Sequence, residues 1–124
     1  MHNKNKYVFI VDSSMISANR IFNAVSKVSG IFKVEHAASG KDALQKIGNN
    51  PPNAILLDIQ LPDISGAAML QQLKEKHPGM AVIVLTDFPT PHSFNVCKKL
   101  GAVGYYNKTM ELDMAIEQLQ KLTK

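Results

Sequence analysis

Four side chains that could do chemistry each follow an apolar run of the sequence. They are Asp12 after 7–11, Asp58 after 54–57, Thr86 after 82–85 and Lys108 after 102–106. If these runs are parallel strands, their carboxyl ends meet at one edge of a sheet, where open α/β folds bind ligands. Two carboxylates, a hydroxyl and an ammonium group at that edge could hold a divalent cation and a phosphoryl group.

The segments around these residues alternate between strand-like and helix-like patterns five times, which predicts βα units and a parallel sheet. The first, third and fourth runs are apolar nearly throughout, as expected for strands covered on both faces. Segment 31–37 is interrupted by Lys33, Glu35 and His36, which predicts an edge strand. Right-handed crossovers then favour a doubly wound, five-stranded parallel α/β sheet in the strand order 2-1-3-4-5.

Five amphipathic segments are predicted to be helices. They are 14–29, a short segment from Ser39 to Gly48, 66–76, a segment from Thr90 to near Gly101, and a last one that begins near Met110. Arg20 lies among the polar residues of the first helix that are expected to point away from the core. Cys97 lies on the apolar face of the fourth helix, which indicates a buried structural cysteine.

Length and composition limit the classes of function. The 124 residues fit one domain, 1–124, with a flexible basic tail at 1–6. One cysteine excludes an internal disulfide and a multi-cysteine metal site. The net charge of +4 comes from scattered lysines, so direct nucleic-acid binding is not expected. The sequence has no apolar run of about 18 residues and no signal-peptide pattern, which predicts a cytoplasmic protein without a membrane partner.

Five elements of the sequence, most of them at predicted strand ends, occur in a fixed order along the chain. They are Asp12, Asp58, the group Leu61-Pro62 with Gly66, Thr86, and Tyr105 with Lys108. In this order the chain resembles the receiver domain of bacterial response regulators, from Tyr7 to about Leu122. The resemblance implies a flavodoxin-like (βα)5 fold and a signalling protein of two-component systems rather than an enzyme with an external substrate.

The resemblance also implies a role for the residues at the sheet edge. Asp58 would accept a phosphoryl group from a sensor histidine kinase or phosphotransfer protein, or from a small acyl phosphate. A carboxylate is a weak nucleophile, so placement and charge neutralisation would supply the catalysis. Mg²⁺ or Mn²⁺ would be held by Asp12, Asp58 and the backbone carbonyl of Gln60. Lys108 would bind the phosphoryl oxygens.

A switch is implied as well. Thr86 would move to the phosphoryl group and Tyr105 would turn inward, changing the surface of the fourth and fifth helices. Exposed methionines suit adaptable contact surfaces, and Met110 and Met114 are expected on the outer side of the last helix. The surface expected to engage an output partner, an effector domain or a second phosphorylated copy comprises His92, Asn95, Lys99, Tyr105, Met110 and Met114.

The chain departs from the family pattern at three positions. Ser13 replaces a second acid, so it would be a weak or water-mediated ligand and magnesium binding would be weaker than in a typical receiver. Asp87, with Phe88 after it, is a candidate modulator; its carboxylate could repel phosphodonors, replace the missing acid or point to solvent. Thr109 replaces a proline that follows a cis bond, and a trans Lys108–Thr109 bond is favoured because a cis bond before threonine costs about 2.5–4 kcal/mol.

These departures keep a second class of function open. In a pseudo-receiver the same fold would serve as an interaction module that works without phosphorylation. Retention of Asp12, Asp58, Thr86 and Lys108 favours the phosphorylated receiver, because degraded chemistry usually removes the acceptor or the lysine.

Overall fold

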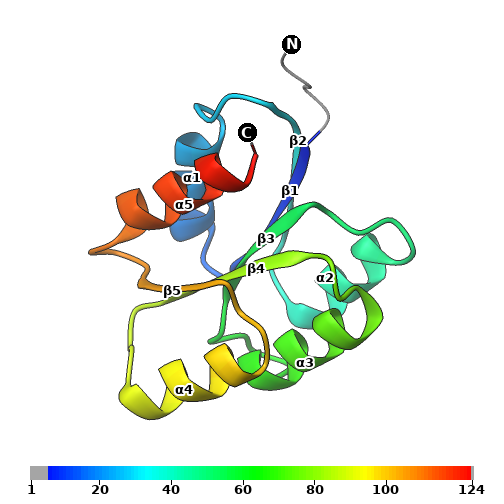
Figure 1. Cartoon of the computed structure of the whole chain (residues 1–124), viewed down its shortest axis with the longest axis vertical. Coiled ribbons are helices and arrows are strands. Elements are labelled where there is room, and N and C mark those ends of the chain that lie inside the picture. Colours follow the sequence, from blue (N-terminus) through cyan, green and yellow to red (C-terminus); the bar gives the residue numbers. More distant parts are fainter. Residues whose placement is uncertain (1–5, 124) are drawn as a thin grey trace.

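The computed structural model describes residues 6–123, in which five strands and five helices alternate along the chain (Figure 1). The strands are β1 (Lys6–Val11), β2 (Ile31–Ala37), β3 (Ala54–Asp58), β4 (Ala81–Thr86) and β5 (Gly104–Asn107). The helices are α1 (Met15–Val25), α2 (Gly40–Ile47), α3 (Gly66–Lys76), α4 (Pro91–Lys99) and α5 (Leu112–Leu122). No helix in residues 6–123 is both long and apolar enough to cross a membrane.

The strands form one parallel sheet in the order β2-β1-β3-β4-β5, which confirms the predicted topology. The register places the carboxyl ends of β1 and β3 side by side, with Val11 opposite Leu57. The strand at 31–37 is at the edge, as predicted, and Lys33 and Glu35 form an ion pair there at 3.0 Å. The polar residues that end β1, β3 and β4 are therefore brought to one edge of the sheet.

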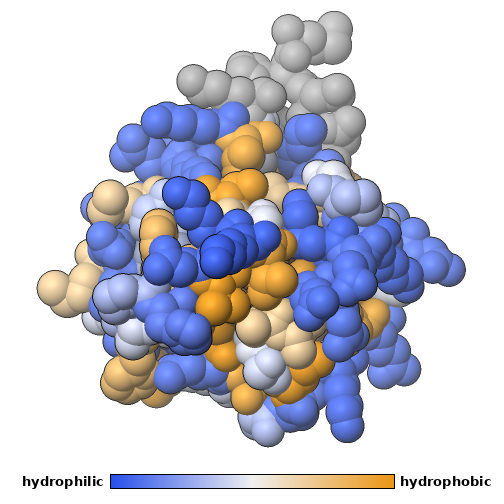
Figure 2. All heavy atoms as spheres, turned by 60° about the horizontal axis from the view of Figure 1, so that its bottom comes forward, coloured by the Kyte–Doolittle hydropathy of each residue, from blue (hydrophilic) through white to orange (hydrophobic). Residues whose placement is uncertain are grey.

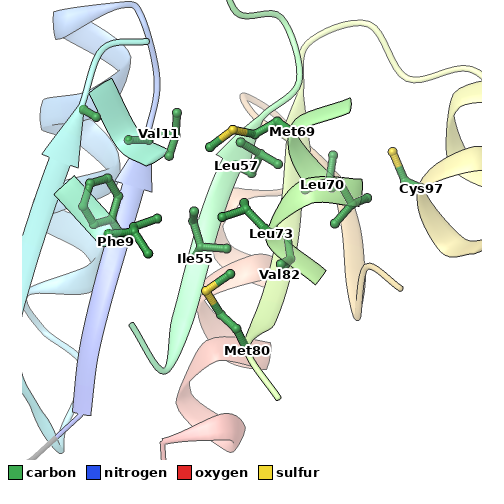
Figure 3. Packing of buried hydrophobic residues seen from close by; sticks show 14 of the residues in the cluster. Phe9, Val11, Ile55, Leu57, Met69, Leu70, Leu73, Met80, Val82 and Cys97 are labelled. Carbon is green, nitrogen blue, oxygen red and sulfur yellow. The ribbon is translucent and has the colours of Figure 1, made fainter. Parts of the chain in front are cut away.

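Helices cover both faces of the sheet (Figure 1). On one face α1 and α5 pack on Val8, Ile10, Leu56, Ile83 and Leu85. On the other face α2, α3 and α4 cover Phe9, Val11, Ile55, Leu57, Val82 and Val84. Figure 3 shows Met69, Leu70 and Leu73 of α3 against this second set. Cys97, which belongs to α4, is buried on the inner side of that helix, as predicted.

Two predicted helix boundaries differ from the structure. Helix α1 ends at Val25 rather than near residue 29, although Val28 beyond its end is still buried, which explains why the apolar pattern continues. Helix α5 begins at Leu112 rather than near Met110, because the Asn107 side-chain oxygen accepts the N–H groups of Thr109 and Met110 and holds them in a turn.

The predicted basic tail extends one residue too far. Residues 1–5 lie outside the described part of the chain, whereas Lys6 is the first residue of β1. Its N–H donates to the Gly30 carbonyl at 3.3 Å, and this bond continues the pairing of β1 with the segment that leads into β2.

The loop between β3 and α3 is held at two points. The Asp63 carboxylate accepts the N–H groups of Gly40 and Lys41 at 3.0 and 2.9 Å, which ties this loop to the first turn of α2. Those bonds lower the pKa of Asp63. At the start of α3, a Cβ atom on Gly66 would lie 2.5 Å from the Cα of Ile59, the residue after Asp58. The close approach of Gly66 thus fixes the loop that follows Asp58.

Substitution Gly66→Ala should therefore destabilise the fold by about 1–3 kcal/mol, because the backbone at Ile59 has to move. Urea unfolding measures the change in free energy. The matched control is Gly79→Ala, where an added Cβ meets no atom within 4 Å. Equal stability of the two variants would show that the close approach at Gly66 does not constrain the loop.

Candidate functional site

The ammonium group of Lys108 lies between two buried carboxylates at the carboxyl edge of the sheet. Its Nζ donates to Asp58 Oδ2 at 2.8 Å and to Asp12 Oδ2 at 3.1 Å. Lys108 is 7% exposed, Asp58 5% and Asp12 0%. The structure thus brings together three of the four residues that the sequence placed at this edge.

Asp12 is positioned by the start of α1. It follows β1, and its N–H donates to the Ala37 carbonyl, which extends the strand pairing by one residue. Its carboxylate accepts the Ser14 N–H at 2.9 Å and the Ser17 hydroxyl at 2.7 Å. Ser14 is also the N-cap of α1, with its side chain accepting from the Ser17 N–H. The helix start and the acid therefore hold each other in place.

Asp58 is the last residue of β3 and Thr86 the last residue of β4. Asp58 Oδ1 accepts the Gln60 N–H at 2.9 Å, so the loop turns back over the carboxylate and brings Gln60 close to it. The Thr86 side chain is buried, and its Oγ1 accepts the Phe88 N–H at 3.1 Å. The Thr86 carbonyl accepts the Lys108 N–H at 2.9 Å, which joins the ends of β4 and β5.

Two acids share a single cation in this cluster, and this sets its electrostatics. Burial raises the pKa of Asp58, and the hydrogen bonds from Lys108 and the Gln60 N–H offset that only in part. Burial also disfavours the charged Lys108, but the hydrogen bonds to Asp58 and Asp12 outweigh it and raise the pKa of Lys108. Lys108 is therefore charged at neutral pH, and the pair of carboxylates retains excess negative charge.

Comparisons with known proteins agree with this geometry. Residues 8–120 match the family model of the response regulator receiver domain. The chain belongs to the response regulator receiver family.

Two of the curated relatives carry names of different kinds. A protein-glutamate methylesterase/protein-glutamine glutaminase of Treponema denticola is 30% identical over 103 residues, which cover 82% of this chain and 28% of that protein. A transcriptional regulatory protein of Bacillus subtilis, YvfU, is 27% identical over 94% of this chain and 58% of its own length. The chain thus spans between about a quarter and about three fifths of these two relatives.

A solved structure shows the same fold. The CheY-like receiver domain protein from Methanospirillum hungatei superposes with a TM-score of 0.84 at 28% identity, covering 94% of this chain and 93% of that one. The receiver fold predicted from the sequence is thereby confirmed.

The donor set of this receiver fits a hard divalent cation. Carboxylate and carbonyl oxygens are the ligands that magnesium prefers, and the excess negative charge of Asp12 and Asp58 would be compensated by such an ion. Within residues 6–123, however, no three acidic, histidine or cysteine side chains lie close enough together to hold a metal. The site therefore offers two carboxylates, and Ser13, which is exposed, stands where receivers usually have a further acid.

The other two departures of this receiver lie together. Asp87 Oδ1 accepts the Thr109 hydroxyl at 2.7 Å, and Asp87 Oδ2 lies 4.0 Å from Lys108 Nζ. Asp87 thus bends toward the lysine; it neither points to solvent alone nor joins a three-acid cluster. Phe88, the other candidate modulator, is 68% exposed. No peptide bond in residues 6–123 is cis, so the trans Lys108–Thr109 bond is confirmed.

The residues of the predicted output surface are all exposed except Tyr105, which is half-buried. The Tyr105 ring packs edge-on against Phe94 at 5.5 Å, and its hydroxyl accepts the Thr90 N–H at 3.4 Å. His92, Asn95 and Lys99 lie on α4 as expected. Met114 lies on α5, but Met110 lies in the turn before that helix, because the Asn107 side chain delays the start of α5.

Three contacts around the site were not predicted. Arg20 is exposed as expected, yet its guanidinium donates to the Lys108 carbonyl at 2.6 Å. Ser17 donates to Asp12, and His36 Nε2 lies 2.9 Å from the Asp12 carbonyl. Only Ser17 had a sequence signal, since a Ser14 cap places it in the first turn of α1 facing the preceding acid.

The raised pKa of Asp58 predicts a pH-dependent effect of removing its charge. A raised folded-state pKa means that the ionised carboxylate costs stability. This cost develops as pH rises from the unfolded-state pKa to the folded-state pKa, and it is fully present above the folded-state pKa. In EDTA at neutral pH, Asp58→Asn should therefore melt at a higher temperature than the wild type. The difference should shrink as pH is lowered through the pKa of Asp58, as followed by circular dichroism.

The control for that experiment is Asp113→Asn, which removes an exposed carboxylate on α5. It should show no comparable gain at neutral pH. A neutral-pH melting temperature of Asp58→Asn at or below that of the wild type would mean that Lys108 fully compensates the buried charge.

Proposed function

We propose that this receiver accepts a phosphoryl group on Asp58 from a sensor histidine kinase or phosphotransfer protein, in a reaction that requires Mg²⁺ or Mn²⁺. The observation that carries the proposal is the 2.8 Å contact between the Lys108 ammonium and Asp58 Oδ2 within a buried cluster of two acids. Such a cluster provides a nucleophile and a cation for phosphoryl oxygens at one point.

In the proposed reaction an Asp58 oxygen attacks the phosphorus of a phosphohistidine. The P–N bond breaks, the imidazole leaves with the bonding electron pair, and an aspartyl phosphate forms. Lys108 then moves from carboxylate to phosphoryl oxygens and spreads the charge of the transition state. The Gln60 N–H holds the Asp58 carboxylate by its other oxygen at 2.9 Å, which fixes the direction of attack.

The proposed metal ligands are Asp12, Asp58 and the backbone carbonyl of Gln60. These ligands would hold a divalent cation, which would offset the negative charge of the carboxylates and of the incoming phosphoryl group. Ser13 contributes at most through water, because a neutral hydroxyl is a weaker ligand than a carboxylate. Ser17 and the Ser14 N–H keep Asp12 oriented while Lys108 is drawn away.

The proposed switch uses Thr86 and Tyr105. Phosphorylation adds about −1.5 to −2 charge at Asp58. The Thr86 hydroxyl would turn to a phosphoryl oxygen, and Tyr105 would leave the Thr90 N–H and turn inward. Because Tyr105 packs against Phe94 of α4, its movement would change the surface of that helix. The outcome is a shift between two populations of the same domain.

The surface proposed to read this change comprises His92, Asn95, Lys99, Tyr105, Met110 and Met114. Met110 is 78% and Met114 49% exposed, which leaves flexible apolar side chains open for contact. Figure 2 turns the side that bears α3 and α4 forward and shows apolar surface bordered by hydrophilic residues on that side of the molecule. An output partner, an effector domain or a second phosphorylated copy would bind at α4 and α5. We take residues 1–124 as a single receiver domain. Cytoplasmic location stays a prediction from the sequence.

The second candidate function is a pseudo-receiver that binds its partner without phosphorylation. Neutral Ser13, and Asp87 at 4.0 Å from Lys108, favour it because both features work against metal and phosphodonor binding. In that case Lys108 would serve only to stabilise the two buried acids.

Incubation with acetyl phosphate and magnesium, followed by intact-mass measurement, separates the two candidates. The phosphorylated receiver should gain one phosphoryl group in a magnesium-dependent manner, and Asp58→Ala should gain none. The cognate kinase, or phosphoramidate, serves as a second donor. No gain from any of these donors would support the pseudo-receiver.

Restoring the acid at position 13 tests the metal site independently of phosphorylation. Ser13→Asp adds a third carboxylate and should tighten magnesium binding about tenfold or more, because hard cations bind more strongly as ligand charge rises. Isothermal titration calorimetry of the unphosphorylated protein measures the affinity. Ser13→Asn is the uncharged control, and equal affinities of the two variants would contradict the proposed position of the metal.

A further inference from the structure

The side chains of two residues that depart from the receiver pattern contact each other at the mouth of the site. The Thr109 hydroxyl donates to Asp87 Oδ1 at 2.7 Å. Asp87 directly follows Thr86 and Thr109 directly follows Lys108, so the bond joins the loops that leave β4 and β5. The two departures thus contact each other directly, and the hydroxyl on one loop holds the carboxylate on the other.

The second oxygen of Asp87 faces the lysine. Asp87 Oδ2 lies 4.0 Å from Lys108 Nζ, and the Asp87 side chain is 39% exposed. Lys108 therefore has buried carboxylates on its inner side and a half-exposed carboxylate on its outer side. Asp87 does not complete a three-acid metal site within residues 6–123. Its position is that of a competitor for the ammonium group.

The hydrogen bond from Thr109 keeps the Asp87 side chain in this orientation. An aspartate on an exposed loop would otherwise gain side-chain entropy and hydration by turning to solvent. A hydroxyl donor to a carboxylate is a charge-assisted bond and resists that rotation. Thr109 is itself fixed, because its N–H donates to the Asn107 side chain at 3.0 Å. Arg20 holds the preceding carbonyl, that of Lys108, at 2.6 Å.

We propose that Asp87, held by Thr109, is an electrostatic gate that makes this receiver slow to accept phosphoryl groups from small anionic donors. The inference rests on the proposed role of Asp58 as phosphoacceptor. A donor's phosphoryl oxygens must reach Lys108 through the side that Asp87 occupies, and the two groups carry charge of the same sign. A docked protein donor can displace the carboxylate with binding energy from its wider interface, whereas a small donor cannot.

The rate of phosphorylation by acetyl phosphate, followed by intact mass, tests the gate. Asp87→Asn keeps the shape and the bond from Thr109 but removes the charge, and it should raise the rate roughly three- to tenfold at low salt. Added salt should reduce this advantage, because the gate faces solvent and is screened. Thr109→Val, which frees the carboxylate, should give an intermediate rate, and Thr109→Ser should restore the slow one.

Glu75→Gln serves as the charge-matched control. It removes an exposed carboxylate near the carboxyl end of α3, a helix that runs away from the phosphorylation edge of the sheet. Its rate should equal that of the wild type. If Asp87→Asn and Glu75→Gln were accelerated alike, the effect would come from net charge and the proposed gate would be wrong.

The remaining outcomes separate the gate from the phosphoacceptor. If wild type and Asp87→Asn are phosphorylated at the same rate, or the advantage persists at high salt, the electrostatic gate is refuted while Asp58 stands. If Thr109→Val matches the wild type, Thr109 does not hold the gate. If no variant gains a phosphoryl group from acetyl phosphate, phosphoramidate or the cognate kinase, the proposal for Asp58 fails. The affinity for beryllofluoride with magnesium, read by NMR, then decides the gate: tighter binding in Asp87→Asn supports it and equal binding overturns it.

Discussion

The sharing of one buried ammonium by two buried carboxylates is the interaction on which the rest of this structure depends. Lys108 donates to Asp12 and Asp58, yet a single cation leaves excess negative charge in a poorly solvated place. Burial is the main cause that raises the pKa of Asp58, and the charge of Asp12 beside it adds to the effect. This excess of negative charge at a ligand-binding sheet edge is suited to bind a divalent cation first. The bound cation and Lys108 would then attract a phosphoryl group, which is the order that the proposed phosphoryl transfer requires.

The surrounding structure holds this cluster from several directions. Ser17 orients Asp12 from α1, while Arg20 of the same helix holds the Lys108 carbonyl. Asp63 ties the loop after Asp58 to the start of α2. Helices on both faces of the sheet therefore contribute to one site. The exposed gate of Asp87 and Thr109 is built on this rigid base, so a small change of charge there can act on Lys108 directly.

Sequence patterns predicted the sheet order and the place of Asp12, Asp58 and Lys108, because parallel strands must bring their carboxyl ends to one edge. They did not predict the contact of Arg20, since a long polar side chain on an exposed helix face has many rotamers. The sequence also left the direction of the Asp87 side chain open, because that direction depends on a hydroxyl 22 residues away in the sequence. The late start of α5 followed from the Asn107 side chain, whose hydrogen bonds compete locally with helix formation.

Reduction of the phosphorylated protein with borohydride, followed by peptide mass mapping, tests the central claim most directly. An aspartyl phosphate is reduced to homoserine, so the converted residue identifies the acceptor. The account predicts conversion at Asp58 alone after incubation with phosphodonor and magnesium. Conversion at Asp12 or Asp87 would contradict the role assigned to the cluster around Lys108. A gain of phosphoryl mass without conversion of any aspartate would contradict it as well.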